Sequence, residues 1–288
     1  GLSPIRMLWL ALILLFVTLS AAGVIWVQRL DFREEVAITA HRGSSRLAPE
    51  NTLSALRQAV ADGADYAEID VQTTRDGQVV LLHDGDFMRL AGDPRRIGDL
   101  TLAEAREIDV GAWFDPAFAG ERIATLDEAI DLVRGELRLN IELKFNRPDS
   151  TLAAAVVDLV RQTGFTEECV ITSLDLASLL EVKRLEPRLT TGLVLTRAVG
   201  NPARLPVDFL SLNTSAAVPR LISYAHREGK AVHVWTVNDP ETMLRMIEAG
   251  ADNVITDEPR DMRRILEERA EFTPSEKLAL QLRRRIIG

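Results

Sequence analysis

The sequence predicts an α/β fold: a (β/α)8 TIM barrel with a small insertion after the second strand, preceded by an N-terminal transmembrane helix. Short β-branched runs alternate with longer helical patterns over residues 36–270, which favours a closed barrel over an open doubly wound sheet, the alternative. The chain is 47% hydrophobic and 27% charged, a balance that excludes a disordered or collagenous protein. A long uncharged apolar run precedes the alternating part.

Residues 7–27 read MLWLALILLFVTLSAAGVIWV and contain no charged side chain. About 20 such residues suffice to cross a hydrocarbon core of roughly 30 Å, and Trp9 and Trp26 stand near the two ends, where indoles favour the membrane interface. The alternative is a secretory signal with a small-residue cleavage region at 20–22. We therefore expect residues 1–30 to be a single transmembrane segment. Basic residues flank both of its ends, so the side of the membrane that holds the barrel stays open.

The remaining chain divides into a polar joint at 31–35, the barrel at 36–270 and a helical tail at 271–288. In the tail, residues 278–287 form an amphipathic pattern with three consecutive arginines, typical of a solvated helix end, with contact to anionic lipid as the alternative.

The strands of the barrel are expected at eight β-branched segments: 36–40, 65–72, 137–143, 169–172, 191–195, 208–212, 231–236 and 253–256. Helical patterns lie between them at 50–62, 126–133, 151–162, 176–186, 218–228, 240–248 and 259–270, whereas the connection at 202–205 is short. A further extended run, 77–84, follows the second strand. The insertion at about 85–123 includes a short helix at 101–108, with Thr101 as its cap and Glu104 three residues later.

Composition excludes several other classes of protein. A net charge of −9 argues against a nucleic-acid binder, which needs a basic face. The one cysteine, Cys169, excludes an intrachain disulfide and a cysteine-based zinc site.

Polar side chains gather where the predicted strands end, which is where barrel enzymes place their catalytic groups. They are His41 and Arg42 after the first strand, Glu68 and Asp70 in the second, His83 after the extra strand, Glu142 and Lys144 at the third, and Trp235 at the seventh. Residues two apart point to the same side of a strand, so Glu68 and Asp70 share one face.

Three carboxylates at one mouth repel each other, and a hard divalent cation relieves that repulsion. We expect Glu68, Asp70 and Glu142 to bind one such ion, Mg²⁺ or Ca²⁺, with Mn²⁺ also suited to oxygen ligands. The alternative is that the acids form ion pairs with Arg42 or Lys144.

Arg42 and Lys144 favour an anionic substrate such as a phosphodiester, whose transition state gathers negative charge on oxygen. His41 and His83 would supply the acid and the base, because the ordinary imidazole pKa of about 6.5 suits both tasks.

The other singled-out residues have weaker signals. We expect His226 on the helix surface and His233 as a packing residue inside the barrel. Trp235 either packs in the core or forms an apolar wall for a substrate alcohol. Pro49 and Glu50 suit the first turn of a helix, and Asn51 would support the fold or hydrogen-bond back to the site.

These residues also resemble the glycerophosphodiester phosphodiesterase family. The resemblance lies in HRGSSRLAPENTLSAL at 41–56, GAD at 63–65, EID at 68–70, TRDG at 74–77 and HD at 83–84. It continues in TLDE at 125–128, ELK at 142–144, VWTVN at 234–238, GAD at 250–252 and TDEP at 256–259, and spans roughly 36–266. MRLAG at 88–92 and IATL at 123–126 depart from the usual family segments, which bears on substrate preference rather than on the chemistry.

The resemblance implies a TIM barrel that hydrolyses glycerophosphodiesters to glycerol 3-phosphate and an alcohol with a divalent metal. It places His41 and His83 as the acid–base pair, and Arg42, Lys144 and Trp235 at substrate-contacting positions. Glu68, Asp70 and Glu142 match the metal ligands. Two alternatives stay open: a lysophospholipase D that uses the same site on membrane lipid, and an inactive sensor that binds phosphodiesters.

Overall fold

The computed structural model describes residues 36–146, 149, 151–197, 200–273 and 276. The predicted transmembrane segment at 1–30, the joint at 31–35 and most of the predicted tail lie outside these residues. Among the residues described, no helix combines the length and the apolar character needed to cross a bilayer. Residues Val36–Ala270 form one compact unit.

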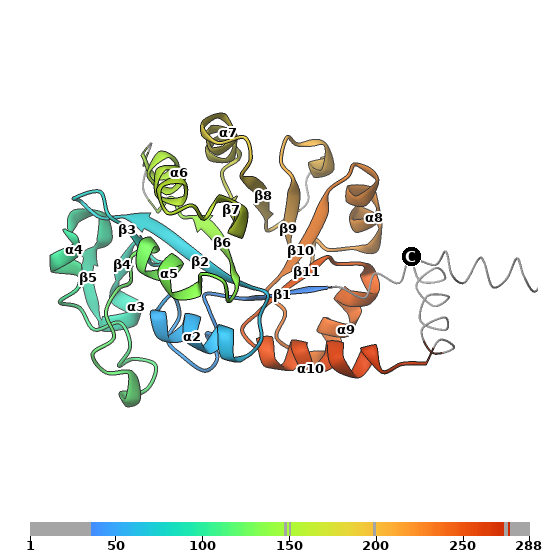
Figure 1. Cartoon of the computed structure of the whole chain (residues 1–288), viewed down its shortest axis with the longest axis horizontal. Helices are drawn as coiled ribbons and strands as arrows, with labels where there is room; N and C mark the ends of the chain where they lie inside the picture. Colours follow the sequence, from blue (N-terminus) through green and yellow to red (C-terminus); the bar gives the residue numbers. More distant parts are fainter. Residues whose placement is uncertain (1–35, 147–148, 150, 198–199, 274–275, 277–288) are drawn as a thin grey trace, which may run out of the picture. The chain divides into compact units, whose positions relative to one another are not determined.

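The barrel consists of parallel strands that close on themselves (Figure 1). In spatial order they are β1 (Ala37–Ala40), β11 (Asn253–Thr256), β10 (Ala231–Trp235), β9 (Phe209–Asn213), β8 (Thr190–Leu195), β7 (Cys169–Ser173), β6 (Arg138–Leu143) and β2 (Tyr66–Thr73). Strand β1 pairs with both β11 and β2, so the sheet has no free edge at β1. The barrel prediction is confirmed, and the open doubly wound sheet is wrong.

Helices cover the outside of the barrel (Figure 1). They are α2 (Leu53–Ala61), α5 (Leu126–Val133), α6 (Leu152–Gln162), α7 (Leu176–Leu185), α8 (Pro219–Arg227), α9 (Pro240–Ala249) and α10 (Pro259–Ala270). A 3-10 turn, η3 (Thr166–Glu168), precedes β7. The short connection between β8 and β9 includes only the 3-10 turn η4 (Pro202–Arg204) among its described residues, as the sequence suggested.

Helix α2 begins later than predicted. Asn51 has a φ of 55°, in the left-handed region, and Thr52 accepts a hydrogen bond from the backbone N–H of Ala55 as the N-cap. Pro49 and Glu50 therefore lie in the loop before the helix, and placing them in its first turn was wrong.

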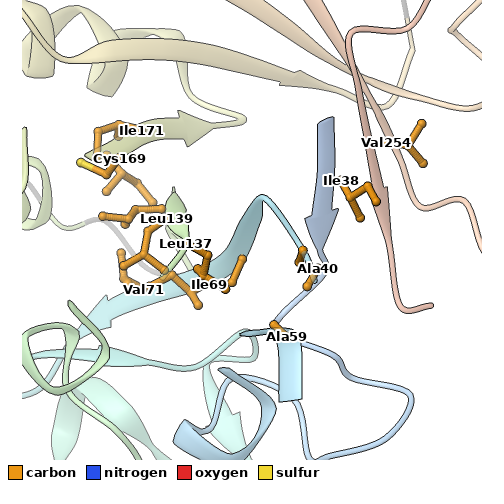
Figure 2. Packing of buried hydrophobic residues seen from close by; sticks show 14 of the residues in the cluster. Ile38, Ala40, Ala59, Ile69, Val71, Leu137, Leu139, Cys169, Ile171 and Val254 are labelled. Carbon is orange, nitrogen blue, oxygen red and sulfur yellow. The ribbon is translucent and has the colours of Figure 1, made fainter. Parts of the chain in front are cut away.

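Alternate strand residues face the helices and the barrel interior. Ile38 and Ala40 on β1, Ile69 on β2 and Leu139 on β6 belong to the buried apolar cluster in Figure 2. The residues between them face inward, where Thr39 Oγ1 donates to Asn253 Oδ1 at 2.8 Å.

The lower interior of the barrel is filled by side chains. His233 is stacked on Phe209 with ring centroids 4.1 Å apart. A Cβ atom at Gly192 would lie 2.1 Å from the Phe209 ring, so only glycine leaves room for that ring. The Phe209 and His233 rings therefore fill part of the barrel interior, as in the packed core of a (β/α)8 barrel.

Residues after β2 form the extra strand and the insertion. Strand β3 (Val79–Leu81) pairs antiparallel with β2. The insertion follows as β4 (Asp86–Phe87), α3 (Met88–Ala91), β5 (Asp93–Arg96), η1 (Ile97–Asp99), α4 (Leu102–Ala105) and η2 (Pro116–Phe118), drawn in teal and green in Figure 1. The predicted capping box of Thr101 and Glu104 is present, although α4 has only four residues. This part has its own apolar cluster, which includes Phe87, Leu90 and Ile97.

Candidate active site

Three buried or half-buried acids meet at the carboxyl end of the barrel strands. Glu68 and Asp70 lie on β2, and Glu142 lies on β6 directly opposite Asp70 in the strand register. Glu68 is 3% exposed and Asp70 is 1% exposed. One carboxylate oxygen from each of the three residues lies within 4.8 Å of the others. The structure thus brings together the three acids that the sequence singled out.

Two cationic side chains contact this acid cluster. Lys144 Nζ lies 3.0 Å from Glu142 Oε1 and 3.4 Å from Asp70 Oδ1. Arg42 Nε lies 3.3 Å from Asp70 Oδ2. The sequence left open that the acids form ion pairs with Arg42 or Lys144 and do not bind a metal. Such ion pairs are present for Asp70 and Glu142.

Glu68 is held differently from its two neighbours. Its Oε2 accepts the backbone N–H of Arg42 at 2.9 Å, and no described Lys or Arg side chain forms an ion pair with it. Burial and the neighbouring Asp70 raise the pKa of Glu68 to about 8. This buried acid therefore lacks the cationic side-chain partner that its two neighbours have.

The donor set of the cluster fits a hard divalent cation. Burial opposes the ionisation of Asp70, yet Lys144 and Arg42 hold its pKa below the usual range. Burial and Asp70 raise the pKa of Glu142. The three groups offer only oxygen atoms, the ligands that Mg²⁺, Ca²⁺ and Mn²⁺ prefer. A cation bound here would supply the positive charge that Glu68 lacks.

Asn51 supports Asp70 from the loop that follows β1. Its Nδ2 donates to Asp70 Oδ2 at 2.9 Å, and its Oδ1 accepts the Asp70 backbone N–H at 3.0 Å. The left-handed φ of Asn51 allows this reciprocal contact, since asparagine tolerates that conformation better than most residues. Asn51 thus fixes one carboxylate of the cluster.

The turn that places Arg42 requires an unusual backbone. Arg42 has a φ of 54° and Gly43 a φ of 78°. A Cβ at Gly43 would lie 2.7 Å from the backbone carbon of Ala55, so only glycine fits beside α2. Arg42 Nη1 then donates to Glu50 Oε1 at 2.8 Å, which orients the guanidinium at the mouth.

The two predicted catalytic histidines interact with different members of the acid cluster. His41 follows β1, and its charge interacts with that of Glu68. His83 follows β3 and interacts with Asp70 and Glu142. Each ring is paired through Nδ1 with an aspartate at 2.7 Å, His41 with Asp257 and His83 with Asp84. Both Nε2 atoms are thereby left for another partner.

Arg89, on α3 of the insertion, joins two acids near His83. Its Nε donates to Asp84 Oδ2 at 2.7 Å, and its Nη1 and Nη2 donate to Glu50 at 2.9 and 2.7 Å. Asp84, Arg89 and Asp257 had no predicted role. The rule that polar groups gather after strand ends would have found Asp257, because β11 ends at Thr256.

The other three residues of interest in the sequence lie on β10 and α8. Trp235 is half-buried, and its indole N–H donates to the carbonyl of Ser211 at 3.0 Å. His233 packs inside the barrel, and burial lowers its pKa to about 4. His226, near the end of α8, is partly exposed, and its Nε2 lies 2.7 Å from Asp252 Oδ2.

Comparison with known proteins gives consistent matches over the barrel. Residues 41–261 match the Glycerophosphoryl diester phosphodiesterase family. A glycerophosphodiester phosphodiesterase from Caldanaerobacter subterraneus subsp. tengcongensis is 35% identical over 233 residues, covering 78% of this chain and 95% of that protein.

Solved structures agree with the sequence match. An Oleispira antarctica phosphodiesterase in complex with the product sn-glycerol-3-phosphate is 29% identical, with a TM-score of 0.75 over 80% of this chain and 96% of that one. A glycerophosphodiester phosphodiesterase from Thermotoga maritima is 28% identical, with a TM-score of 0.67 over 80% of this chain and 98% of that one.

Proposed function

Because the chain belongs to the glycerophosphoryl diester phosphodiesterase family, we propose that it hydrolyses glycerophosphodiesters to glycerol 3-phosphate and an alcohol. The observation that carries this proposal is the acid cluster of Glu68, Asp70 and Glu142, with which His41 and His83 both interact. The related Oleispira enzyme, solved with sn-glycerol-3-phosphate, supports the same product.

The proposed phosphate site lies beside the acid cluster and the two cationic side chains that contact it. Glu68, Asp70 and Glu142 would hold one divalent cation, Mg²⁺, Ca²⁺ or Mn²⁺, which when bound neutralises charge on the phosphoryl oxygens. The Arg42 guanidinium contacts phosphoryl oxygens through its planar fork, and the Lys144 ammonium adds a point charge. Both side chains already lie within ion-pair distance of Asp70.

The two histidines exchange protons with the reacting oxygens. One Nε2 accepts the proton of the nucleophile, which is water or the neighbouring hydroxyl of the glycerol, as a new P–O bond forms. The other Nε2 donates a proton to the alkoxide as the bond between phosphorus and the alcohol oxygen breaks. If the glycerol hydroxyl attacks, the product of this step is a cyclic phosphate, which water then opens to glycerol 3-phosphate with the proton-transfer roles of the two histidines reversed. Pairing of both Nδ1 atoms with aspartates supports this use of Nε2.

The alternative, a lysophospholipid substrate, is supported by exposed apolar side chains after the barrel strands and in the insertion. Leu47 is 44% exposed after β1, and Leu174 is 57% exposed directly after β7. In the insertion, Met88 is 52% exposed and Trp113 is 42% exposed. Such residues are suited to an acyl chain, and the Trp235 ring would form an apolar wall for the alcohol.

We further propose that residues 7–27 anchor the enzyme in a membrane, on the strength of their uncharged apolar sequence. The test is fractionation of cells that express the full chain or a variant lacking residues 1–30. Recovery of the full chain in the carbonate-resistant membrane fraction is expected. Recovery of both forms in the supernatant would contradict the anchor.

A hydrolysis screen tests the proposed activity. The full chain, purified in detergent, is supplied with Mg²⁺, Ca²⁺ or Mn²⁺ and given glycerophosphocholine, glycerophosphoethanolamine or lysophosphatidylcholine. Glycerol 3-phosphate and free alcohol are expected from the first two. Faster release of choline from lysophosphatidylcholine would favour the lysophospholipase D alternative, and binding of all three without product would indicate the phosphodiester sensor.

A further inference from the structure

Strand β11 has an aspartate–histidine pair at each of its ends. Asp252 directly precedes the strand, and its Oδ2 lies 2.7 Å from His226 Nε2. Asp257 directly follows the strand, and its Oδ1 lies 2.7 Å from His41 Nδ1. The two pairs have the same separation between carboxylate and imidazole, but only the second includes a histidine beside the acid cluster.

Asp257 is held by neutral donors on both oxygens. Ser45 Oγ donates to Oδ1 at 2.9 Å, and Asn238 Nδ2 donates to Oδ2 at 2.6 Å. The Asn238 side chain also accepts the Asp257 backbone N–H at 2.9 Å through its Oδ1. These contacts come from the loops after β1 and β10, so the carboxylate is fixed by two neighbouring strands.

The aspartate beside His83 has a different surrounding. Asp84 Oδ2 accepts from the charged Arg89 guanidinium, so part of its negative charge is already compensated. His41 and Ser45 are the side chains that meet Asp257 Oδ1, and Asn238 meets Oδ2. Among these three side-chain partners of Asp257, only the His41 imidazole can carry a positive charge, so the carboxylate interacts electrostatically with that ring.

We infer that Asp257 is a positioning residue that holds the His41 ring with its Nδ1 proton toward Oδ1 and its Nε2 toward the substrate. This inference rests on the proposed function, because it assigns Asp257 a part in the same reaction. The carboxylate fixes the tautomer in which Nε2 takes or gives the proton, and it stabilises the imidazolium formed during turnover. Asp257 itself neither gains nor loses a proton.

The direction of the pKa shift of His41 is consistent with its contact with Asp257. Burial lowers the pKa of His41, but the hydrogen bond to Asp257 and the charge of Glu68 outweigh burial, so the pKa lies above its ordinary value. Arg42 opposes this increase. Of the charged groups that face His41, Asp257 is the one in direct contact with its ring.

The experiment compares Asp257→Asn with Asp252→Asn, which makes the same isosteric change at the opposite end of β11. An asparagine amide that donates to Nδ1 selects the wrong tautomer, so kcat of Asp257→Asn should fall about 10- to 1000-fold, within the range of general acid–base catalysis, while KM changes less. The limb of the kcat–pH profile that reflects protonation of His41 should move to lower pH, because the Asp257 carboxylate that stabilises the imidazolium is lost. Asp252→Asn should keep kcat within a few-fold of the unchanged enzyme.

Ser45→Ala provides a second variant that removes only one donor from Asp257 and should lower kcat by a few-fold at an unchanged melting temperature. Equal kcat values for Asp257→Asn and Asp252→Asn in an active protein would overturn the inference. A lower kcat with no shift of the pH limb would show a merely structural role and would also overturn it. If the unchanged enzyme itself hydrolyses no phosphodiester, the proposed function fails instead.

Discussion

Arg89 Nη2 lies 2.7 Å from Glu50 Oε1, although the two residues are 39 positions apart in the sequence. Arg89 belongs to the insertion and Glu50 to the loop after β1, so this ion pair joins the insertion to the barrel. Glu50 also accepts from Arg42, which contacts Asp70 of the acid cluster. A chain of charged contacts therefore runs from the insertion to the proposed phosphate site.

Arg89→Met should lower kcat/KM by about tenfold, which corresponds to about 1.4 kcal/mol of transition-state stabilisation. The substitution leaves Asp84 and Glu50 without their shared cation, so the orientation of His83 and of Arg42 is less well defined. Initial rates on glycerophosphocholine measure the effect. Arg95→Met is the control, because Arg95 in the same insertion pairs with Asp93; equal losses in both variants would contradict a role for the chain of contacts.

His41→Ala and His83→Ala should each lower turnover at least about 100-fold, the scale of general acid–base catalysis. Each substitution removes the imidazole that exchanges a proton with a reacting oxygen. Steady-state kinetics on protein with unchanged circular dichroism measures the loss. His226→Ala serves as the matched control, since His226 also pairs with an aspartate but lies away from the acids. Near-normal turnover in either histidine variant would remove that residue from the mechanism.

Treatment with a chelator should abolish hydrolysis, and added Mg²⁺, Ca²⁺ or Mn²⁺ should restore it, because the acid cluster offers an all-oxygen donor set. Glu68→Gln should need more cation for half-maximal activity, since one anionic ligand becomes neutral. Rates measured against cation concentration show the shift. Glu121→Gln is the control, since this acid accepts from Ser54, outside the acid cluster. A fully active metal-free preparation would contradict the proposed metal site.

Because His233 is buried, we expect the protein to be less stable in mild acid. Burial lowers its pKa to about 4 in the folded protein, whereas an exposed histidine has a pKa of about 6.5. Between these values the unfolded chain binds a proton that the folded chain does not, so the free energy of unfolding decreases as the pH falls from 6.5 to 4. The expected loss is about 1.6 kcal/mol between pH 6.5 and 5, because the unfolded histidine is already half protonated at pH 6.5.

Urea unfolding at these two pH values measures this loss. His233→Gln should reduce the pH dependence, even if the variant is less stable at neutral pH, whereas His226→Gln should retain it. A His233→Gln protein with the same slope against pH as the unchanged protein would assign the acid sensitivity to other groups.

The barrel and most of the proposed site were predictable from local patterns. Period-two alternation placed Glu68 and Asp70 on one strand face, and the strand-end rule placed His41, His83, Glu142 and Lys144 at the same mouth. These rules work because they depend only on backbone geometry, which each segment specifies for itself.

Side-chain contacts between segments that are distant in the sequence were not predictable in the same way. The pairing of Arg89 with Glu50 depends on how the insertion packs, and no local period encodes it. The start of α2 was misplaced because the left-handed φ of Asn51 is fixed by its reciprocal hydrogen bonds to Asp70, a contact between distant segments. Long-range hydrogen bonds thus overrode the local preference of Pro49 and Glu50 for a first helical turn.

The Phe209 ring, which occupies the space beside Gly192, contributes to the packed interior that makes a (β/α)8 barrel a core and not a pore. An ion bound by the acids, an incoming diester and both departing products would then share a single entrance. Glycerol 3-phosphate bound at this entrance would hinder access to the three acids, so removal of a cation by a chelator should be slower in the presence of that product.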